Sequence, residues 1–190
     1  ERLIILIDEF LDITRIEQNR TKFDFQPVNI ISIIESVTKE LAQKAASKHL
    51  KIKQPPAVDA IQIMADKEKV RHVIFNFVDN AIKYSKKGTI HISVAKEGDG
   101  IAVMIKDNGF GFGKEDGVNF FQKFYRGNNV KNFDVKGTGL GIYVCKKFIE
   151  AHNGIVRAKS SGLGKGSEFG FWIPLTQGTA AGSFFEYKSL

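Results

Sequence analysis

Two asparagines one helical turn apart are the first residues in this sequence whose type and spacing could do chemistry. Asn76 and Asn80 lie in the stretch 66–85, DKEKVRHVIFNFVDNAIKYS, and helical geometry places Lys83 on the same edge. An asparagine oxygen is a neutral ligand suited to Mg²⁺, and a lysine ammonium suits phosphate oxygens. A surface helix with two incidental asparagines accounts for this stretch alone equally well.

Two glycine-containing segments downstream add ligand-binding features. Residues 107–111, Asp-Asn-Gly-Phe-Gly, follow a predicted strand, where the carboxylate of Asp107 can accept a hydrogen bond from an exocyclic amine such as that of adenine. Residues 137–141, Gly-Thr-Gly-Leu-Gly, open an apolar helix whose unpaired backbone N–H groups can bind phosphate. The segment is no P-loop, because no Gly-Lys-Ser/Thr follows. Each segment alone is also compatible with an ordinary turn.

Apolar periodicity predicts the elements that must position these segments. The helix 66–85 has one buried stripe at three- and four-residue steps, with Asp66 as its cap. A second helix, capped by Asn29, is expected to run to about residue 48, and a third from about 140 to 152. Strands are predicted at 51–53, 61–65, 89–95, 101–107, 155–159 and 167–173, of which 89–95 and 101–107 form a hairpin.

Four other segments frame this domain. Residues 1–19 predict an amphipathic helix with an apolar surface too broad for one partner, which indicates a second helix or subunit. Its predicted inward residues are Leu3, Leu6, Ile7, Phe10, Ile13 and Ile16. Residues 21–29 are expected to be an extended linker and 126–137 a mobile polar loop. The tail 176–190 is compatible with a linker or with a strand contact to another chain.

Composition excludes several classes of protein. The 190 residues are enough for one buried domain and an extra element, and 43% hydrophobic with 26% charged residues is typical of a soluble protein. No apolar run could span a bilayer, and no signal-peptide pattern is present. The net charge of +7 is scattered, which argues against nucleic acid. The single Cys145 excludes an internal disulfide, indicates a reducing compartment and is expected in the core.

Four motifs, taken in order, resemble the N, G1, F and G2 boxes of the ATP-binding catalytic domain of bacterial sensor histidine kinases. They are Asn76-x-x-x-Asn80-Ala81-x-Lys83-Tyr84, Asp107-x-Gly109-x-Gly111, Phe120-Phe121-x-x-Phe124-Tyr125-Arg126 and Gly137-Thr138-Gly139-Leu140-Gly141. The resemblance covers about 29–175, while 1–20 resembles the second helix of the dimerisation and phosphoacceptor hairpin and 21–28 a linker. It implies a two-layer α/β sandwich, with a mixed sheet covered by helices on one face, as in gyrase-type ATPases.

The resemblance also implies roles for individual residues. Asn80 would ligate Mg²⁺, with Asn76 beside the metal and phosphates. Lys83 would contact phosphate, Tyr84 would lie against the nucleotide, and Arg126 would neutralise charge on the transferring phosphoryl group. Asp107 would recognise the adenine amine, with Ser167 helping through water. The glycine-rich residues Gly109, Gly111, Gly137, Thr138, Gly139, Leu140 and Gly141 would shape the pocket, and 126–137 would be the ATP lid, anchored by Phe121 and Phe124 unless these are simple core aromatics.

The implied reaction is transfer of the ATP γ-phosphoryl group to a histidine, for relay to an aspartate of a response-regulator receiver domain. In the family the phosphoacceptor histidine lies on the first hairpin helix and is followed by an acidic residue. None of the four histidines here has such a neighbour, so the acceptor is expected on a first hairpin helix outside this sequence. The four histidines are His49, His72, His91 and His152. His72 is expected on the surface or at a pocket rim. The resemblance further implies a homodimer through the hairpin and a cytoplasmic location without membrane contact from this part.

Three alternatives remain open from the residues. One is an ATPase of the same fold, although that class usually carries Glu in place of Asn76 to activate water. A second is a non-catalytic nucleotide-binding or regulatory module, which loss of binding residues would favour. A serine kinase of the anti-sigma type shares the pocket but would not need the N-terminal helix.

Overall fold

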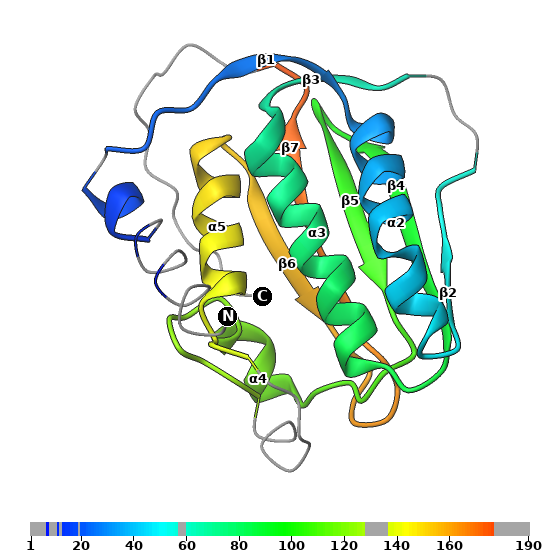
Figure 1. The fold of residues 1–190 in the computed structure, drawn as a ribbon. Coiled ribbons are helices and arrows are strands. Elements are labelled where there is room, and N and C mark those ends of the chain that lie inside the picture. The colour runs from blue at the N-terminus through cyan, green and yellow to red at the C-terminus, as the bar shows by residue number, and fades with distance from the viewer. Residues whose placement is uncertain are drawn as a thin grey trace.

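The computed structural model describes residues 7, 11, 13–18, 20–56, 60–127 and 137–176. A five-stranded mixed sheet is covered on one face by three long helices, as Figure 1 shows. These helices are α2 (Ile30–Ala46), α3 (Lys67–Tyr84) and α5 (Gly141–Ala151). The arrangement confirms the predicted two-layer α/β sandwich.

The sheet places the candidate segment 107–111 at a strand end. Its strands, in spatial order, are β2 (Leu50–Lys53), β4 (Gly88–Glu97), β5 (Gly100–Lys106), β7 (Glu168–Pro174) and β6 (Ile155–Lys159). β2 runs parallel to β4 and every other pair is antiparallel. Glu97 pairs with Gly100 at the turn of the predicted hairpin. β5 ends at Lys106, so Asp107 directly follows this strand, as expected.

Helix α3 lies between α2 and α5 over the sheet (Figure 1). Its predicted cap is confirmed, because the side chain of Asp66 accepts a 3.1 Å hydrogen bond from the Lys69 N–H. The predicted apolar stripe is buried throughout; its members are Val70, Val73, Ile74, Phe77 and Ala81. The polar stripe is thus carried by a helix anchored in the core.

A small two-stranded sheet joins the start of the domain to the start of α3. β1 (Phe25–Asn29) pairs antiparallel with β3 (Gln62–Asp66). The extended backbone predicted for 21–29 is confirmed for β1, but its pairing with β3 was not predicted. Pairing between segments so far apart in the chain leaves no local signal. At the end of β1, Asn29 caps α2 as expected, accepting from the Ile31 N–H at 3.1 Å.

His152 is a buried connector between α5 and the start of α3. Its Nε2 accepts from the Asp66 N–H at 3.0 Å, so Nδ1 carries the proton and donates to the Phe148 carbonyl at 2.6 Å. Burial lowers the pKa of His152, although the Phe148 carbonyl and the Asp66 carboxylate oppose the shift. The ring is therefore neutral, and the rings of Phe23 and Phe25 pack edge-on against it.

The N-terminal helix packs beside α5 through residues 13–17 (Figure 1). Ile13 is buried against the core, as predicted. Glu17 accepts a 2.8 Å hydrogen bond from the Tyr143 hydroxyl on α5 and pairs with Lys123 at 2.6 Å. Ile7, predicted to face inward, is 49% exposed, because one neighbouring surface cannot cover a helix that is apolar on most sides. The predicted inward residues Leu3, Leu6 and Phe10 lie outside the described residues.

Several smaller predictions can be settled in the described ranges. Cys145 is fully buried in the core, as expected. A short helix, α4 (Lys114–Asn119), was not predicted. None of the described helices combines the length and apolar character needed to cross a lipid bilayer. The central part of the predicted lid, 128–136, and the tail 177–190 lie outside the described residues.

Candidate functional site

The two asparagines of α3 contact each other directly. The Asn80 amide nitrogen donates to the Asn76 side-chain oxygen at 2.9 Å, and both side chains are half-buried. Because this bond uses the nitrogen of Asn80, its oxygen is the atom that can ligate a cation. The described residues contain no group of three His, Cys, Asp or Glu that could hold a metal. A carboxamide oxygen and ligand phosphates are nevertheless the oxygen donors that Mg²⁺ prefers, so Asn80 fits this ion.

The glycine-rich segment 137–141 lies against α3. A Cβ at Gly141 would come within 2.5 Å of the Asn76 amide nitrogen, so only glycine leaves that carboxamide undisturbed. A Cβ at Gly137 would lie 3.9 Å from the Tyr84 hydroxyl. The segment is shaped locally by Thr138, whose hydroxyl accepts from the N–H of buried Leu140 at 3.2 Å. Asn76 and Tyr84 were both predicted as site residues, and the fold brings them next to the segment 137–141.

The F motif approaches the same glycine-rich segment. Gly139 has a φ of +75°, and a Cβ there would lie 2.8 Å from the backbone carbonyl carbon of Phe124. The Phe124 side chain is 63% exposed, which contradicts a core role. The aromatic that packs inward is instead Phe120, whose ring centroid lies 4.8 Å from that of Phe112 and 5.4 Å from that of Phe169. Phe121 is half-buried.

Tyr84 and Arg126 are close enough to interact electrostatically. Burial raises the pKa of Tyr84, the Arg126 guanidinium opposes the rise, and Asp79 adds to it. Arg126 is half-buried. The last residue of the F motif is thus near Tyr84, the last residue of α3.

Asp107 is buried at the end of β5 with several donors around its carboxylate. The Ser167 hydroxyl donates directly at 2.5 Å, and the Gly109 N–H donates at 2.7 Å. Burial raises the pKa of Asp107, although these hydrogen bonds counter the shift. Ser167 thus contacts Asp107 directly, and its help to adenine recognition through water stays a prediction.

The two glycines of the G1 motif serve close backbone packing. A Cβ at Gly109 would lie 2.3 Å from the Tyr84 carbonyl oxygen, which also accepts from the Phe110 N–H at 3.1 Å. Gly111 has a φ of +60° and faces the loop between β6 and β7, where a Cβ would meet the Gly162 oxygen at 2.2 Å. Gly109 therefore holds the motif against the end of α3, while Gly111 holds it against the loop.

Lys83 is engaged by a residue that the sequence reasoning missed. Its ammonium lies 2.7 Å from Asp79, a buried carboxylate that also pairs with Lys44 of α2. The spacing of Asp79 and Lys83, four residues apart on a helix, was a readable signal for this ion pair. Lys44 is distant in sequence and gave no such signal. The ammonium of Lys48 donates to the Ile82 carbonyl at 3.1 Å and so caps the end of α3.

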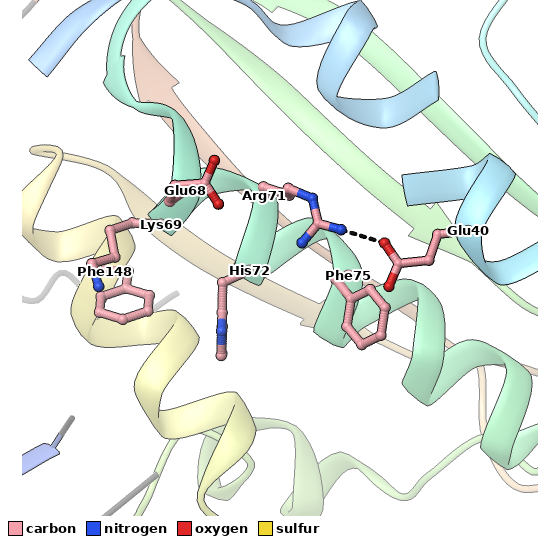
Figure 2. A pocket seen from close by; sticks show the side chains of 7 residues that line it. All are labelled: Glu40, Glu68, Lys69, Arg71, His72, Phe75 and Phe148. Atoms are coloured by element: carbon pink, nitrogen blue, oxygen red, sulfur yellow. Dashed lines mark hydrogen bonds and ion pairs between the residues drawn. The ribbon is translucent and has the colours of Figure 1, made fainter. Parts of the chain in front are cut away.

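A polar cavity of about 310 Å³ lies away from these motifs, over the first half of α3. Figure 2 shows its lining, in which Arg71 reaches from α3 to pair with Glu40 of α2. His72 and Lys69 are close to the Phe148 ring of α5, with the Lys69 ammonium 4.8 Å from the ring centroid. His72 was expected on the surface or at a pocket rim, and it does line this cavity, but no residue of the four motifs lines it.

Comparison with known proteins agrees with the motifs. Residues 65–177 match the family model described as histidine kinase-, DNA gyrase B-, and HSP90-like ATPase. The chain is 33% identical over 177 residues to the sensor protein KdpD of Clostridium acetobutylicum. The aligned region covers 92% of this chain and 19% of that protein. It is 29% identical over 178 residues to the sensor histidine kinase WalK of Bacillus subtilis, covering 92% of this chain and 29% of that protein. The chain thus spans less than a third of these relatives.

Solved structures share the fold. The histidine kinase AdeS of Acinetobacter baumannii superposes with a TM-score of 0.75 at 22% identity, covering 92% of this chain and 79% of that one. Full-length ShkA, solved in complex with AMPPNP, superposes with a TM-score of 0.80 at 24% identity, covering 94% of this chain and 37% of that one. The family model covers more than half of the chain. The chain therefore belongs to the histidine kinase-, DNA gyrase B-, and HSP90-like ATPases, as an ATP-binding catalytic domain of the sensor histidine kinase type.

Proposed function

We propose that this chain binds Mg-ATP between α3 and the segment 137–141 and presents the γ-phosphoryl group to a histidine on another helix. The observation that carries the proposal is the convergence of the four motifs. Gly141 packs against the Asn76 carboxamide and Gly139 against the Phe124 backbone. Segments distant in sequence thus lie against one another, with glycines of both glycine-containing motifs close to Asn76, Tyr84 or Phe124.

The polar stripe of α3 would hold the phosphate end. Asn80 would ligate Mg²⁺ through its side-chain oxygen, and Asn76 would orient it through their 2.9 Å hydrogen bond. Bound Mg²⁺ would neutralise negative charge on the phosphate oxygens. Lys83 would contact phosphate and Arg126 would offset charge on the transferring group.

The buried carboxylate would recognise the base. Asp107 accepts hydrogen bonds from Ser167 and Gly109, which fix its orientation at the end of β5. An adenine amine would be a further donor to this acceptor-only group. Tyr84 would lie against the nucleotide, and the segment 126–137 would close over it.

The transfer needs positioning and not a protein nucleophile in this domain. The bond from the γ-phosphorus to the bridging oxygen of ADP breaks, a bond to a histidine ring nitrogen forms, and ADP leaves. The acceptor would lie on the first hairpin helix, with residues 1–20 as the second helix, 21–28 as linker and 29–175 as catalytic domain. The phosphohistidine would then pass its phosphoryl group to a response-regulator aspartate, in a homodimer formed through the hairpin. Asn76 cannot act as a general base, which disfavours hydrolysis of ATP.

Phosphotransfer from ATP labelled on the γ-phosphate tests this function. The protein is prepared with the first hairpin helix that the proposal requires and compared with its Asn80→Ala variant. Label that is lost in acid, survives base and is absent from Asn80→Ala is the expected result. Binding of ATP without label on the protein would overturn the kinase proposal and favour a regulatory module. Release of labelled phosphate instead would favour an ATPase.

A further inference from the structure

Two lysines share one buried carboxylate beside the proposed phosphate site. Asp79 on α3 is 7% exposed. Its Oδ2 lies 2.7 Å from the Lys83 ammonium, and its Oδ1 accepts from the ammonium of Lys44 on α2. The two lysines are much more exposed than the carboxylate between them. Asp79 is therefore a buried anion with one cation from its own helix and one from the neighbouring helix.

Helical spacing gives Lys83 two possible partners. Lys83 follows Asp79 by four residues and Asn80 by three, so its stem leaves the helix between these two side chains. Here the ammonium lies at Asp79. To contact a phosphate beside Asn80, it must turn from the Asp79 side of the helix toward the Asn80 side.

The carboxylate left behind needs another cation. Each oxygen of Asp79 is bonded to an ammonium group, Oδ1 to Lys44 and Oδ2 to Lys83, which is the pairing of an ionised carboxylate. A buried charge that loses its partner is strongly destabilising. Lys44, which bonds the other carboxylate oxygen, keeps Asp79 paired after Lys83 has turned away.

The geometry points to Lys44 as a positioning residue for nucleotide binding, which acts as the second cation of Asp79 and so releases Lys83 to the nucleotide phosphates. The inference rests on the proposed function, because it requires phosphates near Lys83. It assigns to α2, which carries none of the four motifs, a role in phosphate affinity.

Dissociation constants for ATP and for adenosine, measured by calorimetry on the 190-residue chain, test the inference. Lys44→Met is expected to weaken ATP roughly tenfold, because Lys83 is then the sole cation of Asp79. Adenosine, which has no phosphate, should bind unchanged. Lys44→Arg should keep the affinity, since arginine can also pair with a carboxylate. Lys39→Met removes the same charge from an exposed position of α2 and should leave ATP affinity within about twofold.

A double-mutant cycle separates the specific effect from a general charge effect. In an Asp79→Asn background there is no carboxylate to be left unpaired, so adding Lys44→Met should cause no further loss of ATP affinity. An equal loss in both backgrounds, or no loss from Lys44→Met in the natural chain, would overturn the inference. The ATP affinity of Lys83→Met distinguishes the proposed phosphate role of Lys83 from the positioning role of Lys44. Unchanged ATP affinity in that variant contradicts the phosphate role of Lys83 itself, whereas a loss there without one in Lys44→Met contradicts only the role of Lys44.

Discussion

The Ser167 hydroxyl donates to the Asp107 carboxylate at 2.5 Å across the ends of two neighbouring strands. β5 and β7 are antiparallel with Lys106 opposite Glu168, so Asp107, which follows Lys106, lies opposite Ser167, which precedes Glu168. The Asp107 N–H accordingly donates to the Ser167 carbonyl at 2.8 Å. The register of the sheet, rather than any local turn, holds the hydroxyl at the carboxylate.

Adenosine affinity is expected to fall as the solution is acidified. Burial raises the pKa of Asp107 above its ordinary value of 3.8. As the pH falls through that raised pKa, the carboxylate takes up a proton and becomes a poorer acceptor for the adenine amine. Calorimetry at decreasing pH measures the change. Asp107→Asn should bind adenosine about tenfold or more weakly, without this pH dependence. A pH-independent affinity in the natural chain would contradict the assignment.

Gly141→Ala should weaken Mg-ATP binding without unfolding the protein. The new Cβ would lie 2.5 Å from the Asn76 amide nitrogen and must displace that carboxamide, which orients Asn80. We expect about tenfold weaker Mg-ATP binding, unchanged adenosine binding and no fall in melting temperature. Gly113→Ala is the matched control, because its Cβ would meet nothing nearer than the Asp116 carboxylate at 3.9 Å. Equal effects of the two substitutions would show that Gly141 has no special contact.

Stability should decrease in mild acid because of His152. Burial lowers its pKa from 6.5, so below about that pH the unfolded chain binds a proton that the folded chain does not. The stability contributed by the neutral ring is complete above pH 6.5 and is lost progressively as the pH falls toward and through the lower folded-state pKa. Denaturant unfolding at several pH values measures this slope.

His152→Gln should remove that slope at a cost of about 1–3 kcal/mol near neutral pH, because it loses hydrogen bonds to Asp66 and Phe148. His91→Gln, at an exposed position of β4, is the control and should keep the slope. A natural chain whose stability is constant through this range would show that His152 is not buried neutral in solution.

Glu17→Gln should make Tyr143 easier to ionise. Burial and the hydrogen bond to Glu17 raise the pKa of Tyr143 to about 12. Replacing the carboxylate with a neutral amide removes part of this shift, and ultraviolet titration of the tyrosinate should show a lower pKa. The variant Tyr143→Phe lacks this hydroxyl, so comparison with it shows which part of the titration curve belongs to Tyr143. If Glu17→Gln leaves that component unchanged, the N-terminal helix does not rest against α5 in solution.

Much of the fold was predictable because helices and hairpins leave local signals. The Asp66 cap, the buried stripe of α3 and the β4–β5 hairpin each depend on residues a few positions apart, and all three are confirmed. The exposure of Phe124 was not predictable. Motif position alone does not say which of several neighbouring aromatics faces the core.

The sequence by itself determined the order of the motifs and the helix that carries Asn76 and Asn80, because helical geometry sets contacts up to four residues away. It also determined the place of Asp107 after a strand. Only the tertiary structure decided that Ser167 would bond that carboxylate and that Lys44 would share Asp79 with Lys83. Such contacts depend on strand order, register and the packing of α2 on α3, which no local pattern of residues specifies.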